Sequence, residues 1–418
     1  MIVARALGPE DRGILSFINI SSLFISSIFG FGTSQTFRYF LASKRYVLNE
    51  VFGIALITAV LTGFGAGVFL YALWKLQWLG ETGNVINSEQ MEILFVMCLF
   101  SSLSTMISFL LAGVSKFTFT NRGSIFKSLA LIVSLWLLVI AFGQGLSGAL
   151  VGTLISNVVM VGFFIIGLYR SEKPSFQINT QLLRQGMGYS MKTWIGAITT
   201  SVAQRLDQFT VGYFLNPKDL GIFSLAVHFS EFILFIPSAA DHIYFNKIAQ
   251  IKGDREKRLF NEQFLRSVSL FVIITGLAFI AIGYFIIPIL LGEAYDGVNL
   301  FFLLYAPSVI LWVVPKFLSK FFAASGKPAY ASYITIISVL LMPLFYYPMM
   351  HYLGTIGVVV SSNFITGFII LCCFYLYSRM FPGKAMNLIN YSRSDLIWLW
   401  ERFVAPAYNR VKSMDRKK

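Results

Sequence analysis

The chain has 418 residues, of which 56% are hydrophobic and only 12% are charged, whereas a soluble domain carries about 25% charged residues. This composition, with 42 Phe, excludes a water-soluble globular protein and indicates a polytopic membrane protein. The net charge of +14 is scattered over many short segments, which favours basic cytoplasmic loops over a surface that binds nucleic acid.

Eleven apolar segments are long enough to cross a bilayer, which takes about 20 residues in a helix. They are continuous apolar runs without the in-and-out alternation of barrel strands. Only helices otherwise satisfy their backbone groups in lipid, so we predict an all-α polytopic membrane protein. The predicted spans are residues 14–37, 51–74, 91–115, 126–143, 147–169, 187–211, 221–245, 267–291, 298–322, 330–351 and 356–380.

Basic residues gather in alternate loops between these spans. Arg38, Lys44 and Arg45 follow the first span, and similar groups follow the third, fifth, seventh, ninth and eleventh. Because Lys and Arg are enriched in cytoplasmic loops, we predict that these loops and the C-terminus are cytoplasmic. The segment 1–13 then lies outside.

A short sequence motif occurs twice, half a chain apart. Residues 7–17 read LGPEDRGILSF and residues 215–225 read LNPKDLGIFSL, with Leu7 recurring as Leu215. A second pair, Ser156-Asn157 and Ser362-Asn363, recurs at a similar offset. Internal repeats in a very apolar chain are typical of transporters built from two related halves. We therefore predict two pseudo-symmetric helical bundles with a substrate path between them.

The repeat also sets the expected domains. We predict a five-span bundle at 1–170, a cytoplasmic linker at 171–185, a six-span bundle at 186–381 and a basic cytoplasmic tail at 382–418, for which an amphipathic interfacial helix and a disordered end are the two alternatives. The span at 187–211 has no counterpart in the first half, because the equivalent segment would precede Met1. We predict that the first helix of a twelve-span plan is missing from this sequence; the alternative is a genuine eleven-span protein.

Charged and polar side chains inside spans mark candidate functional positions, since they are unfavourable in lipid. In the span at 187–211, Lys192, Thr199 and Asp207 share one helical face. We expect this face to line a cavity, with Lys192 placed for an anionic head group. Arg205 lies on the opposite side. The alternative is that Lys192 and Arg205 extend to the two membrane interfaces.

The span at 221–245 carries a second polar stripe. It includes His228 and, near the middle of the span, Glu231. We predict that Glu231 couples transport to H⁺ or Na⁺; the alternative is a hydrogen bond between helices. The equivalent span at 14–37 has a polar face that includes Asn19. We expect no other cofactor and no metal.

The turn ARALGPEDRG (residues 4–13) resembles the Wzx-type, O-antigen repeat-unit flippases of the multidrug/oligosaccharidyl-lipid/polysaccharide exporter superfamily. Residues 204–224 resemble the start of that family's second half. The resemblance implies a multi-pass protein of the bacterial inner membrane that moves polyprenyl-pyrophosphate-linked oligosaccharides for O-antigen, lipopolysaccharide or capsule synthesis.

The resemblance also implies partners and residue roles. The implied partners are the lipid-linked oligosaccharide, the bilayer, and polysaccharide polymerase and assembly proteins, with no nucleic acid. Lys192, Arg38 and Arg205 would then fit the pyrophosphate, and Glu231 would fit ion coupling.

Two other functions remain open. A cation-coupled multidrug antiporter of the same superfamily would favour acidic cavity residues such as Glu231 and Asp207, and the basic candidates count against it. A membrane glycan polymerase or acyltransferase needs catalytic groups, often on large outer loops, and the loops here are short. The sequence also has no phosphate-binding Gly loop, HExxH or Gly-x-Ser-x-Gly motif, so we predict that the protein is not an enzyme.

Overall fold

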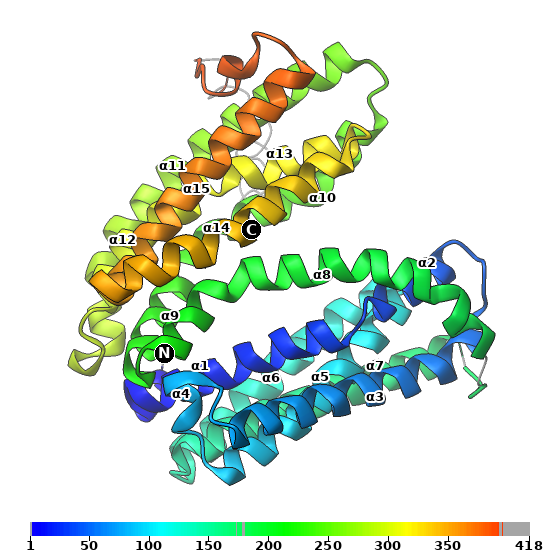
Figure 1. Ribbon diagram of the computed structural model, residues 1–418, viewed down its shortest axis with the longest axis vertical. Helices are drawn as coiled ribbons and strands as arrows, with labels where there is room; N and C mark the ends of the chain where they lie inside the picture. The colour runs from blue at the N-terminus through cyan, green and yellow to red at the C-terminus, as the bar shows by residue number, and fades with distance from the viewer. Residues whose placement is uncertain (1, 173, 178–179, 393–394, 396–418) are drawn as a thin grey trace, which may run out of the picture. The chain divides into compact units, whose positions relative to one another are not determined.

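The computed structural model describes residues 2–172, 174–177, 180–392 and 395, and every long regular element within them is a helix (Figure 1). This confirms the all-α class. The helices are α1 (Ile2–Phe29), α2 (Thr33–Ala42), α3 (Leu48–Lys75), α4 (Gly80–Asn84), α5 (Ser88–Gly113), α6 (Phe117–Leu135), η1 (Trp136–Ala141), α7 (Gly145–Glu172), α8 (Thr180–Phe214), α9 (Pro217–Glu231), η2 (Phe232–Leu234), α10 (Phe235–Gln250), α11 (Asp254–Leu291), η3 (Glu293–Tyr295), α12 (Val298–Leu311), α13 (Val313–Ala324), α14 (Pro328–Leu353), α15 (Thr355–Met380) and η4 (Ala385–Leu388).

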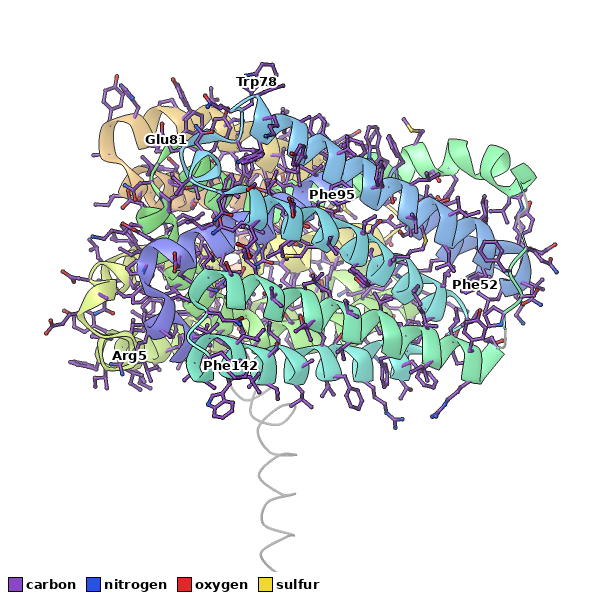
Figure 2. The ribbon with its side chains drawn as sticks, turned by 90° about the horizontal axis from the view of Figure 1, so that it is seen from below. Arg5, Phe52, Trp78, Glu81, Phe95 and Phe142 are labelled. Atoms are coloured by element: carbon purple, nitrogen blue, oxygen red, sulfur yellow. The ribbon has the colours of Figure 1, made fainter. Side chains whose placement is uncertain are left out.

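Among the described residues, nine helical segments are long and apolar enough to cross a membrane, and the chain is a multi-pass membrane protein. They correspond to nine of the eleven predicted spans. Large apolar side chains such as Trp78 and Phe142 project from the surface, where they are 64% and 65% exposed (Figure 2). Such exposure is expected on a surface that faces lipid rather than water.

The other two predicted spans are helical but differ from the prediction. The segment 187–211 lies in α8, which is less apolar than the nine. The segment 221–245 is divided, because the 3₁₀ turn η2 separates α9 from α10. Nine of the eleven predicted spans therefore have the length and hydropathy of a membrane span among the described residues, and the other two are helical without meeting both criteria.

Contacts divide the chain into two compact units. Unit 1 comprises Met1–Ser224 with Leu290–Asp296, and unit 2 comprises Leu225–Ile289 with Gly297–Lys418. The sequence places the boundary at the linker 171–185, whereas contacts group α8 and the start of α9 with the first half. Two sequence-related bundles separated at that linker stay a prediction.

Unit 1 is held together by close packing of α2, α3, α5 and α7 around a buried apolar cluster. Lipid tails are as apolar as these side chains, so tight packing rather than removal from water stabilises the cluster. Small residues make this possible: a Cβ at Gly63 of α3 would lie 2.9 Å from the Cα of Leu99 on α5. Gly67, one turn further on, meets the ring of Phe95 in the same way.

Unit 2 contains a buried polar cluster on α11 that the sequence analysis did not anticipate. Glu262, only 3% exposed, accepts hydrogen bonds from Arg258 at 3.1 Å and Tyr377 at 3.1 Å. Asn387 donates to its second oxygen at 3.4 Å. Tyr244 donates to the neighbouring Asn261. The carboxylate is thus paired and hydrogen-bonded, as a buried charge requires.

The chain after α15 folds back onto this part of α11. Arg266 donates to Asp395 at 3.0 Å and to the carbonyl of Asn387 at 2.7 Å. Ser267 donates to the carbonyl of Asp395 at 3.1 Å. We call residues 385–392 and 395 the C-terminal strap. The remainder of the predicted amphipathic tail, beyond Asp395, lies outside the described residues.

Replacing Glu262 with Ala should destabilise the protein by about 3 kcal/mol, because Arg258 would keep a largely buried charge without its partner. Thermal or denaturant unfolding of the detergent-purified protein measures this. The exposed Glu256 on the same helix is the matched control, and Glu256→Ala should change stability by less than about 0.5 kcal/mol. Equal stability of both variants would contradict the prediction.

Candidate functional site

The two copies of the repeated motif begin their helices in the same manner. Helix α1 is interrupted at Gly8, whose backbone angles are not helical, so Pro9 opens the longer part of α1 as Pro217 opens α9. At a first helical position the missing N–H of proline leaves no hydrogen bond unmade. Gly8 precedes the first with φ +75°, and Asn216 precedes the second. The side chain of Asn216 accepts from the N–H of Asp219 at 2.9 Å, as in a helix cap. The sequence repeat is therefore also a structural repeat.

The two repeated helix starts cross each other inside unit 1. A Cβ built on Gly13 would lie 1.7 Å from the carbonyl oxygen of Pro217. A Cβ built on Gly221 would lie 1.9 Å from the carbonyl oxygen of Pro9. The contact is thus reciprocal, and only glycine permits so close a backbone approach. We call this contact the repeat crossing.

Two serines extend the repeat crossing one turn further. The hydroxyls of Ser16 and Ser224 are 3.0 Å apart, and both residues are at least 95% buried. Ser224 also donates to the carbonyl of Gly221 at 3.1 Å. The residues that the motif repeats in sequence therefore meet in space.

The helix that enters the repeat crossing breaks between α1 and α2, where the sequence predicts a continuous span at 14–37. Phe31 and Gly32 adopt left-handed conformations with φ +46° and +66°. A broken helix leaves carbonyls without partners, and such breaks persist when neighbours supply donors. Here α8 supplies them: Trp194 donates to the carbonyl of Ile28 at 2.6 Å, and Thr193 to that of Gly32 at 3.3 Å.

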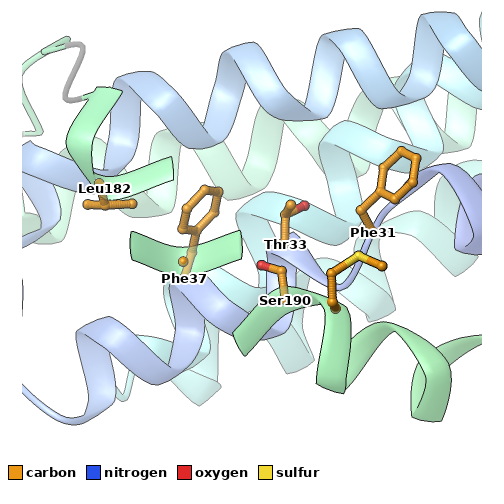
Figure 3. A pocket seen from close by; sticks show the side chains of 7 residues that line it. Phe31, Thr33, Phe37, Leu182 and Ser190 are labelled. Carbon is orange, nitrogen blue, oxygen red and sulfur yellow. The ribbon is translucent and has the colours of Figure 1, made fainter. Parts of the chain in front are cut away.

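A small cavity of about 100 Å³ lies beside this break, between α2 and α8 (Figure 3). The hydroxyls of Thr36 and Ser190 join the two helices nearby at 2.7 Å. Sites for drug-sized ligands occupy about 300–1,000 Å³, so this cavity is too small for an oligosaccharide. Its lining residues are Phe31, Thr33, Phe37, Leu182, Gly186, Ser190 and Met191.

Three of the predicted site residues, Asn19, Thr199 and Arg38, lie in unit 1, and each has a contact with a neighbouring group. Asn19 donates to the carbonyl of Leu15 at 2.8 Å, and Thr199 to that of Ile195 at 2.6 Å. Both bonds stay within the residue's own helix. Arg38 is exposed on α2, with its guanidinium carbon 5.8 Å from the centre of the Phe109 ring.

The other predicted residues of unit 1 lie on α8. Asp207 is only 5% exposed, and its Oδ1 accepts the N–H of Gln208 at 2.7 Å. Arg205 is half-buried. Lys192 belongs to the helix, but its side chain lies outside the described part of the structure. The cavity-lining role of this face stays a prediction.

The structure brings together the two predicted coupling residues of unit 2. Nδ1 of His228 lies 3.5 Å from Oε2 of Glu231, one turn away on α9. Both side chains are about 40% exposed, so the pair is not enclosed by the protein. Glu231 is also the last residue before η2, where the helix changes its winding.

Arg12, within the repeated motif, was missed by the sequence analysis. Its Nε is buried without a hydrogen-bond partner among the described residues. Burial raises the pKa of the nearby Tyr295 to about 12, although the positive charge of Arg12 acts in the opposite direction. The repeat could have identified this residue, because the equivalent position in the second copy is Leu220 rather than a charged residue.

Comparison with solved structures defines the fold. The fold of this chain is similar to that of several solved multi-pass transporters. It matches an inward-facing multidrug resistance MATE family transporter with a TM-score of 0.71 and 17% identity, covering 94% of each chain. It matches the lipid II flippase MurJ, in an inward closed conformation, with a TM-score of 0.76 and 15% identity, covering 97% of this chain and 91% of MurJ. It also matches a MOP superfamily transporter from Pyrococcus furiosus with a TM-score of 0.61 and 16% identity, covering 93% of this chain and 91% of the transporter.

A sequence comparison then gives the family. A family model described as "Polysaccharide biosynthesis protein" matches residues 2–299, and the chain belongs to this family. No curated protein sequence matches the chain.

Replacing Gly13 with Ala should destabilise the repeat crossing by about 1–3 kcal/mol, because the added methyl overlaps the Pro217 carbonyl and forces the helices apart. The same holds for Gly221→Ala. Thermal unfolding in detergent measures the effect. Gly162→Ala in α7 is the control, since its Cβ would meet no atom within 4 Å and alanine favours the helix by about 1 kcal/mol. A Gly13 variant as stable as the Gly162 variant would disprove the tight crossing.

Proposed function

We propose that this protein is a flippase that moves polyprenyl-pyrophosphate-linked oligosaccharide repeat units across the bacterial inner membrane. The product would serve O-antigen or capsule synthesis. Membership in a polysaccharide biosynthesis family supports the pathway. The fold shared with MurJ and MATE transporters supports movement of a substrate through a membrane over a chemical reaction.

The repeat crossing is the observation that carries this proposal. Alternating access uses contacts between helices that close the path on one side and later separate. A contact made of backbone at Gly13 and Gly221 suits this role, because its opening leaves no charge unpaired. Ser224 already has a second acceptor in its own helix, so losing Ser16 need not leave its hydroxyl unsatisfied.

The residues predicted from the sequence would then have different roles according to their charge. Lys192, Arg38 and Arg205 would attract the pyrophosphate, and Asn19 and Thr199 would hydrogen-bond the sugars. Glu231, Asp207 and His228 would couple translocation to an H⁺ or Na⁺ gradient. The C-terminus would lie in the cytoplasm, and polysaccharide polymerase and assembly proteins would receive the product.

One observation favours a second function. The His228–Glu231 pair provides a proton- or cation-binding group in a fold shared with MATE transporters. A cation-coupled drug antiporter would use the same pair. The two proposals differ in substrate: loss of the protein abolishes surface polysaccharide if it is a flippase, and raises drug sensitivity alone if it is an antiporter.

Lys192→Ala and Glu231→Gln should each lower surface polysaccharide in a complementation assay without lowering protein abundance. The first removes a cation for the pyrophosphate, and the second removes the titratable group. Lys252→Ala and Glu89→Gln, at exposed positions, are the charge-matched controls and should complement fully. Full complementation by both test variants would remove Lys192 and Glu231 from the mechanism.

Cysteines at Ser16 and Ser224 should form a disulfide that holds the repeat crossing closed, since the two hydroxyls are 3.0 Å apart. In a chain whose three native cysteines are replaced, oxidation should then abolish flipping of lipid-linked oligosaccharide in membrane vesicles, and a reductant should restore it. Thr62 and Ser102, 2.8 Å apart in the packed α3–α5 pair, provide the control pair. Transport that persists with the Ser16–Ser224 crosslink in place would rule out opening at this crossing.

A further inference from the structure

We infer that Arg12 forms a binding site for the phosphate oxygens of a lipid-linked diphosphate, at the end of α1 where the two repeats cross. The inference rests on the proposed function and names one further contact with its substrate. It differs from the α8 candidates, because it lies in the repeated turn and not along the middle of a span.

The guanidinium of Arg12 is an unmatched charge. Among the described residues it makes no hydrogen bond or ion pair, and its Nε is sealed from solvent. Its terminal nitrogens are not among the fully buried unpartnered atoms, so they remain open to a ligand. A buried charged donor without an acceptor is strongly unfavourable. An arginine held in this way is suited to an anion that arrives from outside the chain.

The groups around Arg12 do not neutralise it. The hydroxyl of Tyr295 donates to the carbonyl of Ala4 at 2.5 Å, so it is engaged elsewhere. Asp11 is adjacent in sequence, but within the described residues it forms no ion pair with Arg12. Glu10 and Asp11 nevertheless place negative charge on the same turn. Because these carboxylates repel anions at a distance, the site does not attract every anion. It favours a ligand that contacts the guanidinium of Arg12 directly.

Comparison of the two repeats shows that the crossing itself does not need this charge. Leu220 occupies the equivalent position, is fully buried, and packs beside Gly212, where a Cβ would lie 2.7 Å from its Cδ2. In the second copy an apolar side chain is therefore sufficient for packing at this position. Packing alone does not explain why the first copy has an arginine there.

The chemistry of the site matches phosphate. Arginine presents a planar set of donors that binds two phosphate oxygens at once. The helix that starts at Pro9 directs its N-terminal partial positive charge toward the same end of α1. Because this end belongs to a membrane-spanning helix, a diphosphate on a lipid can reach it with its chain still in the bilayer.

Binding of short-chain lipid diphosphate to the purified full chain tests the inference. Farnesyl diphosphate, inorganic pyrophosphate and farnesol are titrated, and affinity and thermal stability are measured. The test variant is Arg12→Leu, which copies the second repeat and should fold with unchanged or raised stability. Arg12→Lys keeps the charge without the planar fork, and Arg122→Leu removes an exposed arginine on α6 as the control.

Farnesyl diphosphate should bind the wild-type chain and Arg122→Leu equally, and bind Arg12→Leu about tenfold more weakly or worse. Arg12→Lys should be intermediate, and farnesol should not distinguish the variants. Equal binding by Arg12→Leu would overturn this site and leave the proposed flippase intact. Pyrophosphate that binds as tightly as farnesyl diphosphate would overturn the lipid assignment. Absence of binding to the wild type would count against both proposals.

Discussion

The approach of two backbones at Gly13 and Gly221 is the constraint on which much of unit 1 depends. Each glycine lies against the carbonyl of the proline that starts the opposite helix. Any side chain at either position would separate the helices, and with them the Ser16–Ser224 hydrogen bond. A neighbouring element contacts this arrangement: Thr82 of α4 donates to the carbonyl of Leu215 at 3.4 Å, at the first residue of the second repeat.

Helix α8 connects the repeat crossing to the break in the preceding helix. At one end it leads into the second repeat, and further back its Trp194 and Thr193 supply donors to the carbonyls freed between α1 and α2. The break and the donors come from segments about 160 residues apart in sequence. The break depends on these donors, since an open helix end in a membrane protein needs partners. The polarity of α8 therefore serves the fold as well as any substrate.

Sequence alone was sufficient for the helices with long apolar runs, because hydropathy and length determine them locally. The repeat predicted that Leu7–Phe17 and Leu215–Leu225 fold alike, but not that they touch, since contact is a tertiary property. The break at Phe31 was missed because a left-handed phenylalanine is set by packing against α8 and has no local signal. The proximity of His228 and Glu231 followed from their helical spacing.

Other parts of the candidate site could not be predicted for identifiable reasons. Asn19 lies on a polar face, but its amide donates within its own helix, a choice that helical periodicity does not determine. Arg12 was not predicted because it lies in the turn before the predicted span 14–37, where a charged residue is not unusual. Glu262 lay in a segment interpreted as a basic loop, whereas α11 starts at Asp254 and buries it. Only for Glu262 are deciding partners distant in sequence, since Tyr377 and Asn387 come from the end of the chain.

The C-terminal strap has a practical consequence for work on this protein. The C-terminal strap supplies acceptors to Arg266 from Asp395 and Asn387, and a donor to Glu262 from Asn387, so it is part of the folded body of unit 2. A shortened chain that ends at Pro382 removes all three of these bonds. A truncated or tagged form of the protein must therefore retain Asn387 and Asp395 if α11 is to keep these partners.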